Sequence, residues 1–348
     1  MTNETKEARV LDAIRERRDL VNAAIDEELP VQHPERLYEA TRYILEAGGK
    51  RLRPTVATLA AEAVTGTEPM GADFREFSAL DGTEVDVMRA AVAIEVIQSF
   101  TLIHDDIMDE DELRRGVPAV HEQYDTSTAI LAGDTLYSKA FEFMTETGAA
   151  PQNGLEAMRM LASTCTEICE GQALDVAFES RDDILPEEYL EMVELKTAVL
   201  YGASAATPAV LLGADDDIVD ALYQYGIDSG RAFQIQDDVL DLTVPSEELG
   251  KQRGSDLVEG KETLITLHAR QEGVDVDGLV DADTPAEVTE SAIEEAVAAL
   301  EEAGSIAYAR ETAEDLTERS KEHLELLPES GSRSLLEDLA DYLIVRGY

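Results

Sequence analysis

The stretch Thr101-Leu-Ile-His-Asp-Asp-Ile-Met-Asp-Glu-Asp-Glu-Leu-Arg-Arg-Gly116 gathers six acids and two arginines into sixteen residues. An apolar run precedes it, so we expect the acids at the end of a buried helix rather than on a solvated face. Asp105 and Asp109 would share one helix face, where two carboxylates repel each other unless a cation lies between them. Carboxylates and substrate phosphates are typical ligands of Mg2+, and the forks of Arg114 and Arg115 suit phosphate oxygens. The stretch therefore predicts a magnesium site for a diphosphate.

The composition limits the classes of protein to which the chain can belong. Its 348 residues can bury a substantial core, as one large domain or two. With 75 acids against 28 Lys and Arg, the net charge is −47, which argues against nucleic acids and anionic membranes as partners. Because 44% of the residues are hydrophobic and the acids are spread along the chain, we expect a folded, carboxylate-covered protein suited to a high-salt cytoplasm.

Three other features are interpreted as structural. Cys165 and Cys169 are expected to be small buried side chains, because no further Cys or His completes a metal site. The low-charge run 197–214 contains Pro208 and predicts a buried, kinked helix rather than a membrane span. Residues 1–7 lack the apolar core of a signal peptide.

Apolar residues recur at helical spacing through most of the chain, and no stretch of useful length alternates as a strand does. We therefore predict an all-α protein that forms a single domain over residues 1–348. Two acidic segments, 65–86 and 272–285, are predicted to be surface loops. The expected helices cover 5–29, 37–47, 55–64, 87–108, 126–147, a segment from 155 onward, 186–202, 264–271, 286–303, 305–327 and 332–345.

The basic segment Gly48-Gly-Lys-Arg-Leu-Arg-Pro54 has two interpretations, which both remain open. Glycines allow the backbone to approach an anion closely, and Lys50 and Arg53 would be its charge partners. Alternatively, the glycines end a helix and the basic residues complement its dipole.

Polar residues inside apolar helices are also candidates. Gln172 and Asp175 lie three apart on one helix face, as hydrogen-bonded core or as support for a site. Lys196 and Thr197 begin a long apolar run, and a lysine in that position favours function.

The spacing Asp-Asp-x-x-Asp occurs twice more. In 216–220 the acids precede a helix, so capping explains them. Asp237 and Asp241 instead follow apolar residues and share a helix face, with Lys251 and Lys261 shortly after. We predict that they form the second carboxylate pair of the site.

Taken together, these motifs resemble the trans-isoprenyl diphosphate synthases, an all-helical family of head-to-tail prenyltransferases. The resemblance runs through nearly the whole chain and lies in GGKRLRP (48–54), LIHDDIMD with RRG (102–116), GDTL (133–136), GQALD (171–175), Lys196-Thr197, FQIQDDVLD (233–241), Lys251 and Lys261. It implies one helical domain of the isoprenoid synthase type, with antiparallel helices around a central cavity. It also implies condensation of isopentenyl diphosphate with dimethylallyl, geranyl or farnesyl diphosphate by ionisation, condensation and elimination.

The resemblance also assigns roles to individual residues. Magnesium, three ions per active site, would be held by Asp105, Asp109 and Asp237, supported by Asp106 and Asp241. The allylic diphosphate would be contacted by Arg114, Lys196, Thr197, Gln234, Lys251 and Lys261. Isopentenyl diphosphate would be bound by Lys50, Arg53, Arg115 and Gln98, the last standing where many members have histidine. The residues expected to be catalytic are Asp105, Asp109, Lys196, Asp237 and Lys251, whereas His104 has a family-typical place without a role.

The length of the product is expected to depend on the residues just before Asp105. An aromatic residue five positions before it (Phe100) with a small residue four before it (Thr101) resembles archaeal-type geranylgeranyl (C20) synthases. Farnesyl synthases tend to have aromatic residues at both positions. We therefore expect a C20 product, with farnesyl and C25 products as alternatives.

A different class of function is a catalytically silent subunit that modulates another synthase. Such a subunit should have lost acids or cations from the motifs, whereas this sequence has every metal-ligand position. Terpene cyclases share the fold but would lack GGKRLRP and the second acidic helix in this form. The resemblance further suggests a homodimer in the cytoplasm.

Overall fold

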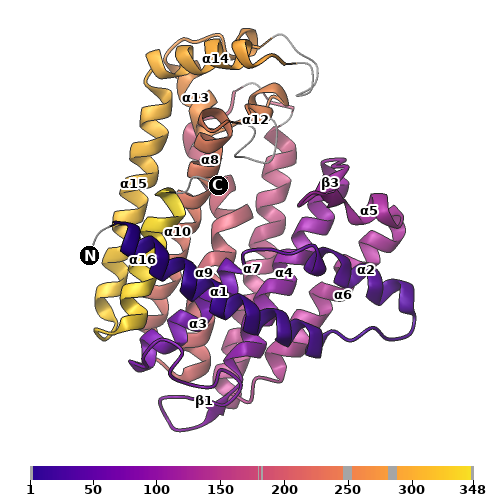
Figure 1. Cartoon of the computed structure of the whole chain (residues 1–348), viewed down its shortest axis with the longest axis vertical. Coiled ribbons are helices and arrows are strands. Elements are labelled where there is room, and N and C mark those ends of the chain that lie inside the picture. The colour runs from indigo at the N-terminus through magenta and orange to yellow at the C-terminus, as the bar shows by residue number, and fades with distance from the viewer. Residues whose placement is uncertain (1–2, 179, 182, 246–252, 281–287, 346–348) are drawn as a thin grey trace. The chain divides into compact units, whose positions relative to one another are not determined.

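The computed structural model describes residues 3–178, 180–181, 183–245, 253–280 and 288–345, and the described chain is almost entirely helical (Figure 1). Two antiparallel hairpins of two-residue strands, β1 with β2 and β3 with β4, are the only sheets in these residues. The all-α prediction is confirmed. The elements are α1 (Asn3–Glu28), α2 (Glu35–Glu46), α3 (Leu52–Thr65), β1 (Phe77–Ser78), β2 (Glu84–Val85), α4 (Val87–Met108), β3 (Leu113–Arg114), β4 (Val117–Pro118), α5 (Val120–Gln123), α6 (Thr126–Thr145), α7 (Pro151–Phe178), α8 (Pro186–Val193), a π-helical segment (Glu194–Ala198), α9 (Val199–Leu212), α10 (Asp216–Thr243), α12 (Ser255–Val258), α13 (Leu264–Gln271), 3-10 turns (Val276–Gly278 and Leu324–Leu326), α14 (Glu290–Glu302), α15 (Ser305–His323) and α16 (Gly331–Val345).

The chain divides into two compact units. Unit 1 consists of Met1–Cys165, Ala203–Tyr223 and Leu324–Asp338, and unit 2 consists of Thr166–Gly202, Gln224–His323 and Leu339–Tyr348. The division passes through α7, α9, α10 and α16. The single-domain organisation therefore stays a prediction, and each unit is described separately below.

In unit 1, the central helix is α4, which packs most extensively against α6 and also against α3 and α1 (Figure 1). Its residues from Val87 to Ile97 are almost all buried, on every face of the helix. A helix that is apolar all round belongs in a core, so the sequence places α4 there directly. Asp86 caps its first turn by accepting a hydrogen bond from the Arg89 N–H at 2.7 Å.

A buried ion pair joins α1 to α3 in unit 1. The Arg17 guanidinium donates to Glu62 at 2.5 Å, and both side chains are fully buried. Glu62 also accepts from the Met70 N–H at 2.6 Å and from the Ser332 hydroxyl at 3.1 Å. One carboxylate thus ties the loop after α3 and the start of α16 to the core.

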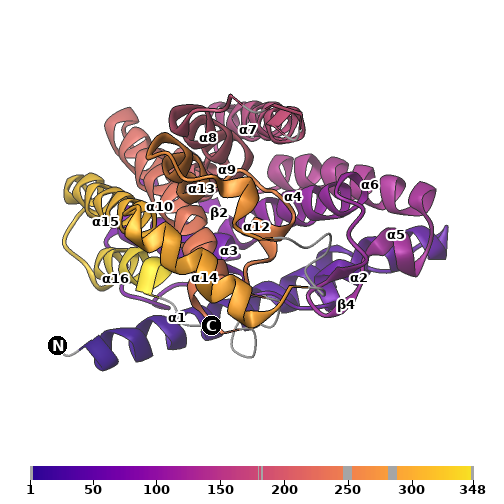
Figure 2. The ribbon, with the colours of Figure 1, turned by 90° about the horizontal axis from the view of Figure 1, so that it is seen from above.

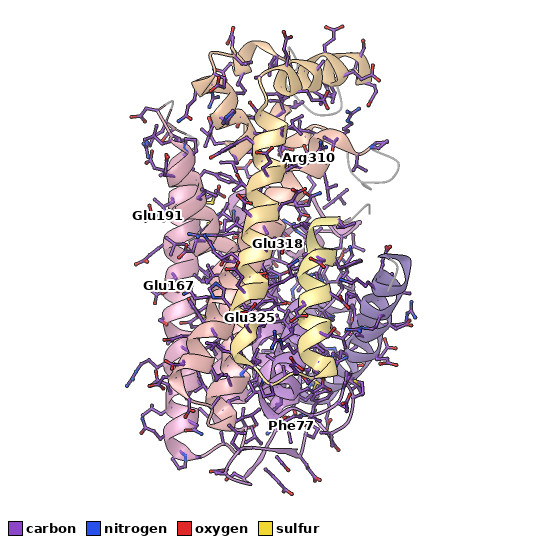
Figure 3. The ribbon with its side chains drawn as sticks, turned by 90° about the vertical axis from the view of Figure 1, so that its left-hand side faces the viewer. Phe77, Glu167, Glu191, Arg310, Glu318 and Glu325 are labelled. Atoms are coloured by element: carbon purple, nitrogen blue, oxygen red, sulfur yellow. The ribbon has the colours of Figure 1, made fainter. Side chains whose placement is uncertain are left out.

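In unit 2, α13 packs against α15, α8 and α14 (Figure 2). The hydrophobic core of unit 2 includes Tyr189, Ile265, Ile293 and Leu300. Acidic side chains such as Glu191 and Glu318 project outward from α8 and α15 (Figure 3), as the acidic composition predicts for a folded protein.

Several element boundaries differ from those expected. Helix α7 begins at Pro151 rather than 155, since proline is well tolerated in the first turn of a helix. Helix α3 begins at Leu52 rather than 55, so it includes part of the basic motif. Helix α14 begins at Glu290 rather than 286, because Thr289 caps it by accepting from the Ala292 N–H. The predicted loop 65–86 carries the β1–β2 hairpin.

Two described helical stretches are long and apolar enough to cross a membrane by length and composition alone, Val87–Met108 and Pro186–Leu212. The apolar windows are 67% and 83% buried inside the structure, as expected of core helices. Pro208 lies inside α9. The interpretation of the low-charge run as buried helix is therefore confirmed.

Glu62→Gln is expected to lower the free energy of unfolding by about 3–5 kcal/mol, because it leaves the Arg17 charge buried without its partner. Denaturant titration at constant salt measures this change. Glu16→Gln, at an exposed position on α1, is the control and should leave the midpoint nearly unchanged. Equal effects of the two substitutions would contradict a stabilising role for the pair.

Candidate active site

The predicted acidic pair lies at the C-terminal end of α4 in unit 1. Asp105 is in the last turn and Asp109 follows the helix, with the Asp109 N–H donating to the Asp105 carbonyl oxygen at 2.8 Å. Their shared helix face is thus confirmed. The negative end of the helix dipole disfavours acids here, and the last turn of α4 contains no basic residue. A bound cation would remove both the repulsion and the unfavourable dipole.

The acids at 216–220, which have the same spacing, lie at the start of a helix rather than at its end. Asp216 and Asp217 lie in the first turn of α10. Acids there complement the positive end of the helix dipole. They lie inside the first turn rather than before the helix, so their structural interpretation holds through the dipole. The same spacing of acids is thus favourable at the start of a helix and unfavourable at its end.

Asp106 and Arg114 close the turn that follows α4. Arg114 donates from Nε to Asp106 Oδ1 at 2.6 Å and from Nη2 to Asp111 at 3.0 Å, so its fork holds acids in this structure. The other oxygen of Asp106 is buried and has no hydrogen-bond partner among the described residues. An unmatched buried carboxylate oxygen fits a hard divalent cation nearby.

No three His, Cys, Asp or Glu side chains in the described residues converge to hold an ion by themselves. Magnesium commonly keeps waters and is bound by one or two carboxylates together with substrate phosphates. The residues at the end of α4 therefore fit an ion that is completed by a phosphate-bearing ligand.

The three cations of the basic loop between α2 and α3 differ in their exposure to solvent. Arg51 is buried, whereas Lys50 is exposed and Arg53 is half-buried. Gly48 and Gly49 both have positive φ, and a Cβ on Gly49 would lie 3.0 Å from Nη1 of Arg115. The positive φ of Gly49 favours glycine, and the guanidinium of Arg115 packs closely against it, so both interpretations of the glycines remain compatible with the structure.

Arg115 lies near three other arginines, two of which are paired with acids. Its Nη1 donates to the carbonyl oxygens of Ile44, at 3.3 Å, and Gly48. Burial lowers the pKa of Arg115, as does repulsion from nearby arginines, against an opposing attraction from Glu95. Those arginines are Arg51, Arg114 and Arg53. In a chain with a net charge of −47, four arginines so close together are unusual, and their position agrees with the predicted phosphate contacts.

An aromatic cluster links α4 to α6 just before the acids. The centroid of the Phe100 ring lies 4.8 Å from that of the His104 ring and 5.3 Å from that of the Tyr137 ring. Tyr137 in turn packs against Phe141. The Thr101 hydroxyl donates back to the Gln98 carbonyl oxygen at 2.9 Å. Phe100 is therefore the bulky side chain of the two proposed length determinants, held by aromatic neighbours.

The structure gives His104 a packing role that the sequence had left open. Its Nε2 lies 3.2 Å from the carbonyl oxygen of Ile130 on α6. A Cβ on Gly133 would lie 2.4 Å from the same nitrogen. The glycine of GDTL therefore admits the imidazole and lets α4 and α6 pack closely.

In unit 2, Lys196 and Thr197 lie on the π-helical segment Glu194–Ala198. Such bulges are frequent at functional sites. The ammonium group of Lys196 pairs with Asp175, and a Cβ on Gly171 would lie 2.2 Å from the Lys196 backbone nitrogen. The GQALD motif thus supports the lysine. Both amide atoms of Gln172 are buried without a partner in the described part of the chain.

A chain of hydrogen bonds starts from Thr197. Its hydroxyl donates to Gln234 Oε1 at 3.4 Å, and Gln234 Nε2 donates to Asp238 at 3.2 Å. The Tyr189 hydroxyl donates to the other oxygen of Asp238. Burial raises the pKa of Asp238 to about 8, with a further increase from the charge of Asp256.

Asp238 and Tyr189 were missed as candidates by sequence reasoning. Asp238 is the second acid of FQIQDDVLD, so the motif contained the signal. Nothing in the sequence pairs it with Tyr189, because the contact joins α8 to α10.

Asp241 is fully buried and holds the segment that follows α10. It accepts from the Ser255 hydroxyl at 2.9 Å and from the Asp256 N–H at 3.2 Å. Lys261 is 58% exposed and pairs with Glu259 at 2.9 Å and with Asp256 at 3.7 Å. Lys251 lies outside the described residues.

The predicted site residues thus fall into two groups, each described within its own unit. Unit 1 contains Lys50, Arg53, Gln98, Phe100, Thr101, Asp105, Asp106, Asp109, Arg114 and Arg115, and unit 2 contains Lys196, Thr197, Gln234, Asp237, Asp241 and Lys261. A joint site that contains Asp105, Asp109 and Asp237 stays a prediction.

Gly171→Ala is expected to lower the melting temperature, because the new Cβ would meet the backbone of the π-helical segment, which cannot move aside as a side chain can. Gly154→Ala is the matched control in the same helix, α7, where a Cβ would meet nothing within 4 Å. It should be neutral or stabilising, by up to about 1 kcal/mol. Thermal unfolding of both variants checks this, and an equal loss in both would contradict it.

Comparison with known proteins identifies the family. The chain matches the family described as polyprenyl synthetase over residues 34–300. It is 66% identical over 339 residues to the geranylfarnesyl diphosphate synthase of Natronomonas pharaonis, covering 97% of this chain and 98% of that one.

Solved structures agree with this assignment. Geranylgeranyl pyrophosphate synthetase from the archaeon Geoglobus acetivorans matches with a TM-score of 0.84 and 46% identity, covering 96% of this chain and 99% of that one. A polyprenyl synthase from Caulobacter crescentus CB15, complexed with calcium and isoprenyl diphosphate, matches with a TM-score of 0.80 and 30% identity, covering 97% and 98%. The chain therefore belongs to the polyprenyl synthetase family and is a prenyltransferase that acts on isoprenyl diphosphates.

Proposed function

We propose that the protein is a geranylgeranyl diphosphate synthase, which condenses isopentenyl diphosphate with allylic diphosphates up to a C20 product. One observation carries the proposal in this structure. An acidic pair at the end of α4, which favours a cation, lies in the same unit as a cluster of four arginines around Arg115, which favours an anion. A metal-bound diphosphate is a ligand that suits both features.

The proposed metal ligands are Asp105, Asp109 and Asp237, with Asp106 and Asp241 in support. Their oxygen donors suit Mg2+, and the calcium in the Caulobacter crescentus structure is consistent with a divalent site of this kind. Three ions per active site is the family expectation. Bound there, Mg2+ would stabilise the charge that develops on the departing diphosphate.

The cations of the chain have separate proposed tasks. Lys50, Arg53 and Arg115, with Gln98, bind isopentenyl diphosphate and orient its double bond toward the allylic carbon. The allylic diphosphate is contacted by Arg114, Lys196, Thr197, Gln234, Lys251 and Lys261.

The pairs of Arg114 and Lys196 with acids keep these side chains in place until a diphosphate offers a stronger acceptor. The carbon–oxygen bond of the allylic substrate breaks, the double bond of isopentenyl diphosphate attacks the allylic cation, and a proton then leaves, most simply to the released diphosphate. No protein nucleophile is required.

The C20 product is supported by Phe100, the bulky residue one to two turns before the acids, and by the name of the Geoglobus acetivorans relative. A C25 product is the second candidate, because the Natronomonas pharaonis relative, which shares 66% identity, is a geranylfarnesyl synthase. A farnesyl product is the third possibility for the same reaction. A silent subunit is disfavoured, since the motif acids and cations are all present in the sequence.

We also propose that the enzyme works as a homodimer in a cytoplasm of high salt. Ile130 and Leu131 on α6 are 42% and 55% exposed, which offers apolar surface that a second copy can cover. The net charge of −47 supports the salt requirement, because screening removes most of the repulsion among surface acids.

Purified protein at high salt, given Mg2+, labelled isopentenyl diphosphate and each allylic primer in turn, is expected to yield a C20 diphosphate. Chelation of the metal should stop the reaction, because the leaving diphosphate would lose its counter-charge. Chromatography of the dephosphorylated products measures both effects. Asp216→Asn, in the acidic motif that only begins α10, is the matched control and should leave the product and rate unchanged.

Each other outcome of this assay has a definite meaning. A C25 or C15 product would replace the proposed chain length while retaining the reaction. Absence of condensation with every primer would contradict the enzyme and favour the silent subunit.

Phe100→Ala is expected to give products longer than those of the wild type, because it removes the ring that would block the growing chain. Phe141→Ala is the matched control. It removes a ring of the same aromatic cluster from α6 without shortening the side chain before Asp105. Chromatography of the products of both variants measures the chain lengths. An unchanged product from the Phe100 variant would refute the proposal that this side chain limits the length of the product.

A further inference from the structure

The buried pair Arg51–Glu95 lies directly behind the basic loop of unit 1. Arg51 donates from Nη1 to Glu95 at 2.5 Å, and the two side chains are only 2% and 5% exposed. Arg51 also donates from Nε to Asn22 at 2.9 Å and from Nη2 to the Leu45 carbonyl oxygen at 2.7 Å. Its side chain therefore binds residues of α1, α4 and the last turn of α2.

This pair fixes the backbone of the loop. Arg51 has φ +53°, in the left-handed region that a non-glycine residue adopts only when its surroundings hold it there. Its carbonyl oxygen accepts from the Thr55 N–H at 3.0 Å and so begins α3. Because Lys50 and Arg53 flank this residue, the direction in which both cations leave the loop depends on it.

Glu95 lies on the same side of α4 as the predicted site residues Gln98 and Asp105. It is three residues before Gln98 and ten before Asp105, so all three fall on one side of the helix. The rise of an α-helix places Glu95 about 15 Å from Asp105 along the axis. The ion pair thus connects the basic loop to the helix that carries the acidic pair.

Glu95 is also a counter-ion for the arginine cluster. Its charge acts on Arg115 against the repulsion from Arg51, Arg53 and Arg114. Without it, the cations of the loop would repel one another in a partly buried setting, and the loop would open.

We propose that Glu95 and Arg51 are positioning residues, which set the geometry of the Lys50–Arg53 loop for the diphosphate of isopentenyl diphosphate. The inference rests on the proposed function. The pair does not touch the substrate. It acts by holding Lys50 and Arg53 so that both reach the same anion.

Glu95→Gln tests the proposal by steady-state kinetics with isopentenyl diphosphate varied at saturating allylic diphosphate. The KM for isopentenyl diphosphate is expected to rise about tenfold or more, as for a displaced binding group. The KM for the allylic diphosphate and kcat should stay within about threefold of wild type, since groups that act on ionisation are untouched. Asn22→Ala, which removes one hydrogen bond from Arg51, should produce a smaller change in the same direction.

Glu62→Gln is the matched control. The Arg17–Glu62 pair has the same 2.5 Å separation and is equally buried, but it lies away from the basic loop. Both Gln variants should lower the melting temperature, and only Glu95→Gln should raise the KM for isopentenyl diphosphate. An unchanged KM in Glu95→Gln, or an equal rise in Glu62→Gln, would overturn the proposal in favour of a purely structural pair.

Two further outcomes are distinguishable. If Glu95→Gln does not fold, Asn22→Ala carries the test, and an unchanged KM in that variant overturns the proposal. If wild-type protein does not condense isopentenyl diphosphate, the proposed function fails. Calorimetric titration with inorganic diphosphate then tests the loop directly, and equal affinity of wild type and Asn22→Ala overturns the positioning role.

Discussion

At the end of α4 the carboxylates of Asp105 and Asp109 lie on one helix face, where their own repulsion and the helix dipole both disfavour them. The turn that follows places one cation beside this acidic stretch, because Arg114 binds Asp106 and Asp111. The same turn brings Arg115 to the Gly48 carbonyl oxygen, next to the basic loop. Acid repulsion on one helix is thus coupled, through a short hairpin, to a cluster of cations. A metal-bound diphosphate, the ligand proposed for this site, would stabilise both groups.

Two glycines show how motifs without chemistry of their own contribute to the site. Gly133 makes room for His104 and brings α6 close to α4, while Gly171 makes room for the π-helical segment that carries Lys196. In both cases a Cβ would lie closer than side chains allow. These glycines belong to the motifs because the helices that carry the predicted site residues approach their neighbours closely, and only hydrogen fits in the gap.

Most of the fold was predictable because helix periodicity is a local property. The all-α class and the structural interpretation of Asp216 followed from patterns within single helices. Boundaries such as the start of α3 at Leu52 were less accurate, since the residue before this helix, Arg51, has a left-handed backbone and a partner on α4 that no local pattern reveals. Asp238 was overlooked because its burial and its bond from Tyr189 depend on a second helix.

The sequence by itself indicated a metal site for a diphosphate, since acids four apart at the end of an apolar helix and arginines after them require only helix geometry and charge. The ordered set of motifs then indicated the class of chemistry through their resemblance to a known family. Only the tertiary structure decided which cations of the basic loop are buried and which are exposed. Arg51 is buried against Glu95, a residue 44 positions away, while Lys50 stays exposed beside it. Neighbours in a loop can point in opposite directions, and their partners come from other helices. For this reason, no local pattern separates a buried cation from an exposed one in this loop.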